Sequence, residues 1–208
     1  MDSLAFLFDL LLHLDQHLIG LIQTFGSWTY VILFGIVFVE TGIVIFPFLP
    51  GDSLLFVAGT LAAAGALNVW LLFALFAIAA ILGDSVNYAL GKSLGVKAFQ
   101  KWLKPEHLKR TEEFFQKYGA KTIVLARFFP VIRTIAPFVA GIGKMEYKKF
   151  LAFNVLGGIL WTALFVGAGY FFGNIPIVKE NFSAVIIFII IISLIPALVE
   201  FARMKAKK

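Results

Sequence analysis

The chain has 208 residues, of which 61% are hydrophobic and 14% are charged, a balance that predicts an integral membrane protein rather than a soluble one. Its length provides for about five or six membrane-embedded segments of about 20 residues each. The absence of cysteine excludes disulfides, iron–sulfur clusters and thiolate zinc sites, and three histidines offer little for another metal site. We therefore expect neither a metal nor a cofactor.

Positive charge is confined to the second part of the chain. Residues 1–91 contain six acidic residues and no Lys or Arg, so all 18 basic residues come later. Most of them form three clusters, at 92–121, 144–149 and 203–208. The positive-inside rule places these clusters, and with them the C-terminus, in the cytoplasm. Because most basic residues flank apolar segments, we expect attraction to anionic lipid and no nucleic-acid binding.

The apolar stretch 39–59, VETGIVIFPFLPGDSLLFVAG, carries costly residues in its middle. The carboxylates Glu40 and Asp52 would each cost about 2.5–3.5 kcal/mol at the bilayer centre. The stretch also contains three residues that break helices: Pro47, Pro50 and Gly51. We predict an apolar helix at 28–46 and a shorter one at 53–65, which together form a re-entrant hairpin around a polar site.

A second broken stretch covers 121–143, KTIVLARFFPVIRTIAPFVAGIG. Arg127 and Arg133 interrupt an apolar run, together with two predicted helix breaks at Pro130 and Pro137. Because both flanks, Lys121 and Lys144, are basic, re-entry from the cytoplasm fits better than a single crossing.

The fold class predicted is an all-α integral membrane protein with two opposed re-entrant hairpins, three spanning helices and amphipathic surface helices. The spanning helices are expected at 67–91, 148–172 and 183–202. An interfacial helix is expected at 3–25, with a further span as the alternative, and a cationic amphipathic segment at 94–119. The whole chain forms one membrane domain, in this order: N-terminal amphipathic segment 1–26, first repeat 27–91, cytoplasmic segment 92–120, second repeat 121–173 and C-terminal spanning helix 183–203.

The two broken stretches resemble each other. PFLPGDSLLFVAG and PVIRTIAPFVAG each run from a proline through a polar break to an Ala-Gly pair, and Asp52 and Thr134 each stand six residues before that alanine. Inverted repeats with discontinuous helices around a midplane site are typical of secondary transporters. We predict such a repeat, with a chance likeness between apolar segments as the alternative.

The charged residues of these stretches are the candidate site. Arg127 and Arg133 suit the binding of a phosphate headgroup, because guanidinium groups grip phosphate oxygens in bidentate fashion. The alternative is a structural ion pair with Glu40 or Asp52. For Glu40 and Asp52 we predict proton coupling or gating. The alternative is a permanent ion pair for Glu40 and an N-cap for Asp52. Thr134 could likewise cap its helix.

Asp84 and Asn87 are secondary candidates that share one helical face, and Asp84 is a candidate partner of either arginine. Tyr88 and Trp161 are predicted to be packing or interface aromatics. Because no nucleophile–base pair and no phosphate-cradling glycine loop stands out, we do not expect an enzyme.

Three stretches resemble signature sequences of the DedA family, whose VTT domain also occurs in eukaryotic lipid scramblases: VETGIVIFPFLPGDSLLFVAG, GDSVNYALGKSLG and LARFFPVIRTIAPFVAGIGKMEYKKF. The resemblance covers about residues 25–175. It implies a bacterial inner-membrane protein with opposed re-entrant hairpins that recycles lipid phosphates, notably undecaprenyl phosphate. It also implies links to proton motive force, cell division and resistance to cationic antimicrobials. The acids and arginines on which the family depends match Glu40, Asp52, Arg127 and Arg133.

We therefore predict a flippase for a polyprenyl phosphate, with the lipid and protons as its partners. The arginines would bind the phosphate, and the two acids would gate the step or couple it to protons. Helices with spaced glycines would allow a homodimer. Two alternatives remain: a proton-coupled antiporter of small cations or drugs, and a non-transporting factor in membrane homeostasis or cell division.

Overall fold

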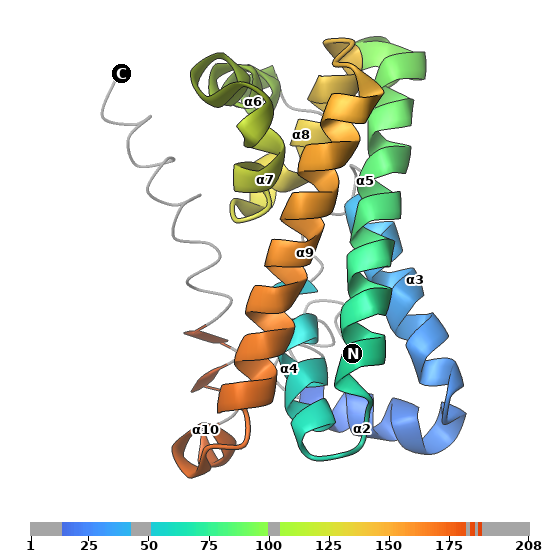
Figure 1. Cartoon of the computed structure of the whole chain (residues 1–208), viewed down its shortest axis with the longest axis vertical. Helices are drawn as coiled ribbons and strands as arrows, with labels where there is room; N and C mark the ends of the chain where they lie inside the picture. Colours follow the sequence, from blue (N-terminus) through green and yellow to red (C-terminus); the bar gives the residue numbers. More distant parts are fainter. Residues whose placement is uncertain (1–13, 43–50, 100–104, 182–183, 186, 189–208) are drawn as a thin grey trace, which may run out of the picture. The chain divides into compact units, whose positions relative to one another are not determined.

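The computed structural model describes residues 14–42, 51–99, 105–181, 184–185 and 187–188. These residues form helices and turns and contain no strand, which confirms the all-α prediction for this part of the chain. In chain order (Figure 1) the elements are α2 (Leu14–Phe25), α3 (Trp28–Gly42), α4 (Gly51–Ala63), α5 (Val69–Phe99), α6 (Pro105–Tyr118), the 3₁₀ turn η1 (Gly119–Lys121), α7 (Thr122–Ala126), α8 (Pro130–Ile142), α9 (Tyr147–Phe172) and α10 (Pro176–Glu180).

Two of the described helices are long and apolar enough to cross a membrane, Val69–Gly95 of α5 and the whole of α9. Asn68 caps α5, because its Oδ1 accepts a hydrogen bond from the Leu71 N–H at 3.0 Å. α5 continues beyond the predicted end at residue 91 and kinks at Gly95, whose φ of 63° favours glycine. The third predicted span, 183–202, lies almost entirely outside the described residues.

The chain divides into two compact units. Unit 1 comprises Met1–Phe34, Pro50–Phe76 and Thr162–Ile192, and unit 2 comprises Gly35–Leu49, Ala77–Trp161 and Ser193–Lys208. Among the described elements, α2, α4 and α10 belong to unit 1, whereas α6, η1, α7 and α8 belong to unit 2.

In unit 1, α4 packs against the second half of α9 through two glycines (Figure 1). A Cβ atom added at Gly59 would lie 2.3 Å from the Val166 carbonyl oxygen, and one added at Gly169 would lie 2.0 Å from that of Phe56. The Thr60 hydroxyl adds a hydrogen bond of 3.3 Å to the Gly169 carbonyl. Glycine is required at both positions because the two backbones meet directly.

In unit 2, α8 packs against α5 by the same pattern. A Cβ atom added at Gly141 would lie 2.1 Å from the Tyr88 carbonyl oxygen, and one added at Gly91 would lie 2.1 Å from that of Phe138. In both units each glycine faces the carbonyl of the residue three positions before the partner glycine. We call this arrangement the reciprocal glycine contact. Each short helix thus contacts the long helix of the other predicted repeat.

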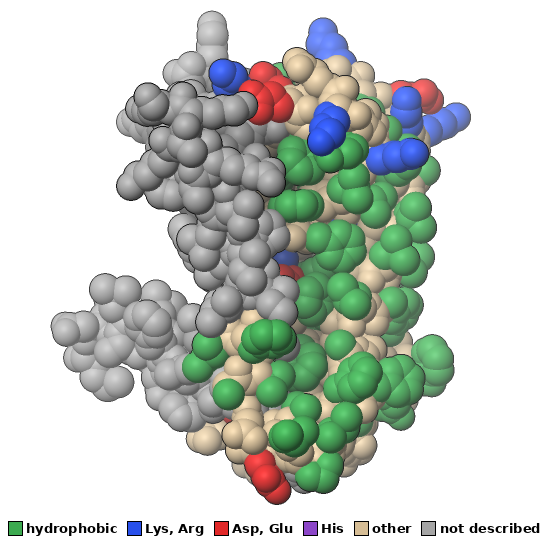
Figure 2. All heavy atoms as spheres, turned by 90° about the vertical axis from the view of Figure 1, so that its left-hand side faces the viewer, with side chains coloured by type: hydrophobic (Ala, Val, Ile, Leu, Met, Phe, Trp, Pro, Cys, Tyr) green, Lys and Arg blue, Asp and Glu red, His purple; other side chains and the backbone are tan. Residues whose placement is uncertain are grey.

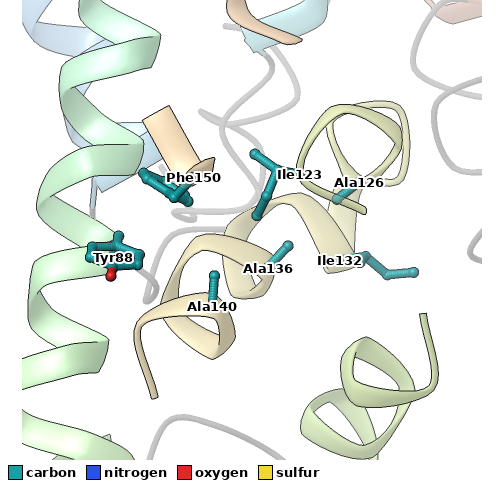
Figure 3. Close-up of a cluster of buried hydrophobic side chains, with 7 residues drawn as sticks. All are labelled: Tyr88, Ile123, Ala126, Ile132, Ala136, Ala140 and Phe150. Atoms are coloured by element: carbon teal, nitrogen blue, oxygen red, sulfur yellow. The ribbon is translucent and has the colours of Figure 1, made fainter. Parts of the chain in front are cut away.

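The hydrophobic core of unit 2 joins α5, α7, α8 and the first half of α9. Figure 3 shows its fully buried members, which are Tyr88, Ile123, Ala126, Ile132, Ala136, Ala140 and Phe150. The amphipathic helix α6 covers α7 and α8, and its Phe114 and Phe115 pack against this cluster. Tyr88, predicted as a packing aromatic, stacks on Phe150 with ring centroids 4.5 Å apart.

The surface of unit 2 separates lysines from apolar side chains (Figure 2). The exposed lysines described in unit 2 are Lys92, Lys109, Lys117, Lys121, Lys144, Lys148 and Lys149. Figure 2 shows Lys and Arg side chains gathered together, apart from most of the hydrophobic ones. Large apolar side chains are exposed along α5 and α9, among them Leu82, Val86, Leu156 and Leu160. An exposed apolar band of this kind suits a lipid environment, with the lysines at the headgroup level.

The helix breaks differ from the sequence prediction in two ways. α4 begins at Gly51 rather than at residue 53, so Asp52 lies in its first turn and is not its cap. α8 begins at Pro130 and contains both Thr134 and Pro137 in its interior, so Thr134 is not a cap and Pro137 does not break the helix. The interruption lies instead at residues 127–129, because a residue that precedes proline is driven out of the helical conformation.

Candidate functional site

The first ion pair of unit 2 joins α3 to α8. Glu40 lies in the last turn of α3, and its carboxylate accepts a hydrogen bond from the guanidinium of Arg133. The Glu40 side chain is 1% exposed and that of Arg133 is 11% exposed. Desolvating a charge costs several kcal/mol unless a partner compensates, so the pairing lets both residues occupy an apolar setting. Arg133 is the more accessible member of the pair.

The second ion pair joins the interruption after α7 to α5. Arg127 Nη2 donates to Asp84 Oδ2 at 2.5 Å and to Asn154 Oδ1 of α9, also at 2.5 Å. The side chains of Arg127 and Asp84 are 5% and 6% exposed. Asn154 in turn donates from Nδ2 to the Ile81 carbonyl at 2.9 Å. Arg127, which follows α7, is therefore held by side chains of two other helices, α5 and α9.

The backbone between the two arginines explains their positions. Arg127 closes the short helix α7, and Phe129 takes an extended conformation with φ −124° and ψ 102°. Pro130 then opens α8, where its missing N–H costs nothing because the first helical N–H groups have no partner within the helix. Arg133 follows in the first turns of α8. The two arginines are therefore separated in sequence by the interruption, and both belong to unit 2.

Asn87 links the two broken segments within unit 2. Its Nδ2 donates to the Thr134 carbonyl in α8 at 2.7 Å and to the Thr41 carbonyl at the end of α3 at 3.3 Å. The Thr41 carbonyl is among the last four of its helix, which have no intrahelical donor. Asn87 Oδ1 is buried and accepts no hydrogen bond. Asn87 therefore ties the end of α3 to the interior of α8 and leaves one buried acceptor at the site.

These side chains surround a small cavity with about 10 Å³ of free space, part of which opens outward. Its lining comes wholly from unit 2: Glu40, Thr41, Asp84, Arg127, Arg133, Thr134 and Trp161. With two carboxylates and two guanidinium groups in their ordinary charge states, the lining carries no net charge. In the described part of the chain, no three His, Asp or Glu side chains gather as metal ligands would.

Most of the residues predicted from the sequence meet in this one unit. Glu40, Asp84, Arg127, Arg133 and Thr134 line the cavity, and Asn87 contacts two of its walls. Asp84 is the partner of Arg127, one of the two arginines proposed for it.

Asp52 is not among the residues that line the cavity. Asp52 is buried in the first turn of α4, in unit 1. Pro47 and Pro50 fall outside the described residues.

Two residues of the site belong to α9. Asn154 is not among the predicted residues, although it holds Arg127. Trp161, predicted to be a packing or interface aromatic, is indeed buried at 1% exposed, and it also lies against the site, with its ring centroid 5.6 Å from Arg133 Cζ. Both lie on one face of α9, in the sequence NVLGGILW. This spacing could have indicated the site from the sequence, because Asn154 and Trp161 are seven residues apart and flank Gly157 and Gly158.

Comparisons with known proteins agree on one family. The model of the VTT domain matches residues 49–171. The protein DedA of Escherichia coli strain K12 is 51% identical over 211 residues, covering 99% of this chain and 96% of the relative.

Two less similar relatives are named as membrane proteins. The uncharacterized membrane protein Rv0364 of Mycobacterium tuberculosis strain H37Rv is 42% identical and covers 89% of this chain and 84% of its own. The inner membrane protein YqjA of Escherichia coli strain K12 is 37% identical, and the match covers 71% of this chain and 69% of YqjA. No solved structure gave a significant match.

Proposed function

The chain belongs to the DedA family of VTT-domain membrane proteins, and we propose that it is a flippase for a lipid phosphate in the bacterial inner membrane. Undecaprenyl phosphate is the substrate we put first. The observation that supports this most is the pair of arginines beside one cavity, Arg127 buried and Arg133 partly buried, each with a carboxylate partner. Arginine stays charged in any such setting, and its planar fork matches phosphate oxygens.

The cavity is too small for a whole lipid. Its free space in this conformation is about 10 Å³, which is room for about one water molecule. We infer that a phosphate group enters only when the Glu40–Arg133 ion pair separates, and that a long polyprenyl chain does not enter at all. In this proposal the tail stays in the bilayer and only the phosphate passes through the protein.

The two arginines have different parts in the proposal. Arg133 binds the phosphate directly, because it is the more accessible of the two and has a carboxylate partner that a phosphate can replace. Arg127 is held by Asp84 and Asn154, so it contributes positive potential to the cavity. This division refines the expectation that both arginines grip the phosphate.

Charge balance connects phosphate binding to protons. The cavity lining is neutral before the substrate binds, so a phosphate adds uncompensated negative charge to a buried site. Uptake of a proton by Glu40 removes one negative charge and frees Arg133 in the same step. Asp52 completes the proposal as a second acid that gates the path, in keeping with its buried place at the start of α4.

Liposomes that contain undecaprenyl phosphate test the function directly. A phosphatase added outside releases phosphate only from the outer leaflet, so release continues to completion only when the protein moves lipid outward. We expect Arg133→Ala to slow the second phase by about ten- to a hundredfold, since a lost charged hydrogen bond is worth about 1.5–3 kcal/mol. Lys117→Ala, an exposed lysine outside the cavity, serves as the control. An unchanged rate in Arg133→Ala would refute the phosphate-binding role.

Proton coupling has its own variant. Glu40→Gln cannot exchange a proton, so we expect flipping whose rate no longer depends on an imposed pH gradient. The wild type should respond to the same gradient. A gradient dependence that survives in Glu40→Gln would move the coupling to another residue, with Asp52→Asn as the next variant to measure.

The cation antiporter remains the second candidate because the cavity also holds two carboxylates. The exposed fractions favour the anion, since Arg133 is the accessible member of its pair and Glu40 is almost fully buried. A pH-sensitive dye in the same liposomes separates the two. Cation-driven proton release without lipid movement would establish the antiporter, and the absence of both activities would favour a non-transporting role.

A further inference from the structure

Four residues of α9 lie on one face of the helix and contact both arginines of the cavity. Asn154, Gly157, Gly158 and Trp161 stand at positions i, i+3, i+4 and i+7, which line up on an α-helix. We call them the α9 stripe. All four belong to unit 2, like the arginines themselves.

Asn154 orients Arg127 because its own amide is fixed. Its Nδ2 donates to the Ile81 carbonyl at 2.9 Å and to the Ser85 hydroxyl at 3.4 Å, both in α5. With the amide nitrogen bound there, Oδ1 must point the other way, where it accepts from Arg127 Nη2 at 2.5 Å. A side chain that is itself anchored thus sets the position of the guanidinium.

The two glycines of the stripe leave space for the same arginine. A Cβ atom added at Gly157 would lie 3.0 Å from both Cδ and Nε of Arg127. One added at Gly158 would lie 3.6 Å from Arg127 Nη2 and 3.0 Å from a side-chain carbon of Ile81. Gly167, in the same helix, has no atom within 4 Å of its added Cβ. The requirement for glycine at 157 therefore comes mainly from Arg127, with the Val124 Cα at 3.3 Å as the next contact, and not from α9 itself.

Trp161 supports the other arginine. Its indole is buried, lines the cavity and lies beneath the guanidinium of Arg133, with Cζ 5.6 Å from the ring centroid. A cation over an aromatic face is attracted by the ring, and this attraction does not need a carboxylate. When the ion pair between Glu40 and Arg133 breaks, the indole still holds the guanidinium in place.

We propose that the α9 stripe is the arginine-positioning element of the site. Asn154 and Gly157 hold Arg127 in one fixed place, and Trp161 keeps Arg133 oriented while its anionic partner changes from Glu40 to the substrate. The identity of that substrate rests on the proposed function. The positioning itself can be measured without transport.

Trp161 reports on Arg133 through its fluorescence. The chain has three other tryptophans, Trp28, Trp70 and Trp102, which are changed to Phe to leave a single emitter. We expect Arg133→Gln to alter the emission of Trp161 in this protein. Farnesyl phosphate added in detergent should alter it as well, with farnesol as the control that lacks the phosphate. If Arg133→Gln leaves the emission unchanged, the contact between Arg133 and Trp161 is refuted.

Flipping kinetics separate positioning from a merely structural role. We expect Trp161→Leu to raise the KM for undecaprenyl phosphate by about two- to thirtyfold with little change in kcat, and Trp161→Phe to stay within about threefold. A fall in kcat alone, or equal loss in both variants, would contradict the role given to the indole.

Gly157→Ala and Gly167→Ala form a matched pair in one helix. We expect the first to lower the apparent unfolding temperature and the second to leave it unchanged. In the double variant Asp84→Asn, Arg127→Ala the effect of Gly157→Ala should shrink, because the Cδ and Nε atoms that face the added Cβ are gone and only the Val124 Cα, at 3.3 Å, remains close to it. An equal effect in both backgrounds would refute the stripe. A wild type that moves no lipid phosphate would refute the proposed function and leave these measurements valid.

Discussion

Removing Arg127 alone should destabilise the protein strongly, whereas removing its partner as well should restore most of the loss. Arg127 and Asp84 are 5% and 6% exposed, so the change Arg127→Met leaves the Asp84 carboxylate buried without its counter-ion and Asn154 without its donor. Breaking one side of a buried pair costs about 3–5 kcal/mol. In a chain of this length each kcal/mol lowers the midpoint by about 2–4 °C, so we expect a fall of roughly 6–20 °C.

The assay is thermal unfolding in detergent, followed by intrinsic fluorescence at one fixed heating rate. Asp84→Asn combined with Arg127→Met has no buried charge at this place, so its midpoint should lie much closer to that of the wild type. Lys117→Met, at an exposed lysine, is the control and should shift stability by less than about 0.5 kcal/mol. A single variant as stable as the wild type, or a double variant no better than the single one, would refute the reasoning.

Two further predictions concern packing and topology. Gly141→Ala places a Cβ 2.1 Å from a carbonyl oxygen of α5, so it should cost about 1–3 kcal/mol in the same unfolding assay, whereas Gly35→Ala, with nothing within 4 Å, should cost nothing. Because the chain has no cysteine, the labelling of a single introduced cysteine has no background. Ala66→Cys and Glu180→Cys should react with an impermeant thiol reagent outside intact cells, and Glu106→Cys should not. Labelling of Glu106→Cys from outside would overturn the proposed opposed hairpins.

The sequence revealed the charged part of the site because charge is costly in an apolar segment. Glu40 and Arg133 stand out in runs that would otherwise cross a membrane, and each needs a partner of opposite charge. Their partnership in the structure follows from that need. Asp84 carries the same signal more weakly, since it comes near the predicted end of a span, where a carboxylate costs less.

The neutral part of the site could not be predicted in the same way. Asn154 and Trp161 are unremarkable in an apolar helix, and their roles exist only because Arg127 and Arg133 lie against that face. Pro137 misled the prediction for a related reason. Its missing N–H removes the helical donor for the carbonyl of Arg133, yet the helix continues because the surrounding contacts in unit 2 hold α8 in place.

The reciprocal glycine contacts also set the order in which the chain can assemble during synthesis. The partners α5 and α8 are close in sequence, since Asn87 and the Thr134 that it binds are 47 positions apart. The partners α4 and α9 are far apart in sequence, since Thr60 and Gly169 are 109 positions apart. At about 5–20 residues per second, α4 waits roughly 5–20 s for its partner to be made.

During that interval α4 carries a carboxylate, Asp52, without the helix that it packs against in the finished protein. α8, by contrast, meets a partner that is already present when it leaves the ribosome. The two short helices therefore pack at different times, although their contacts have the same form. α8 packs soon after it is made, whereas α4 is made first and packs last.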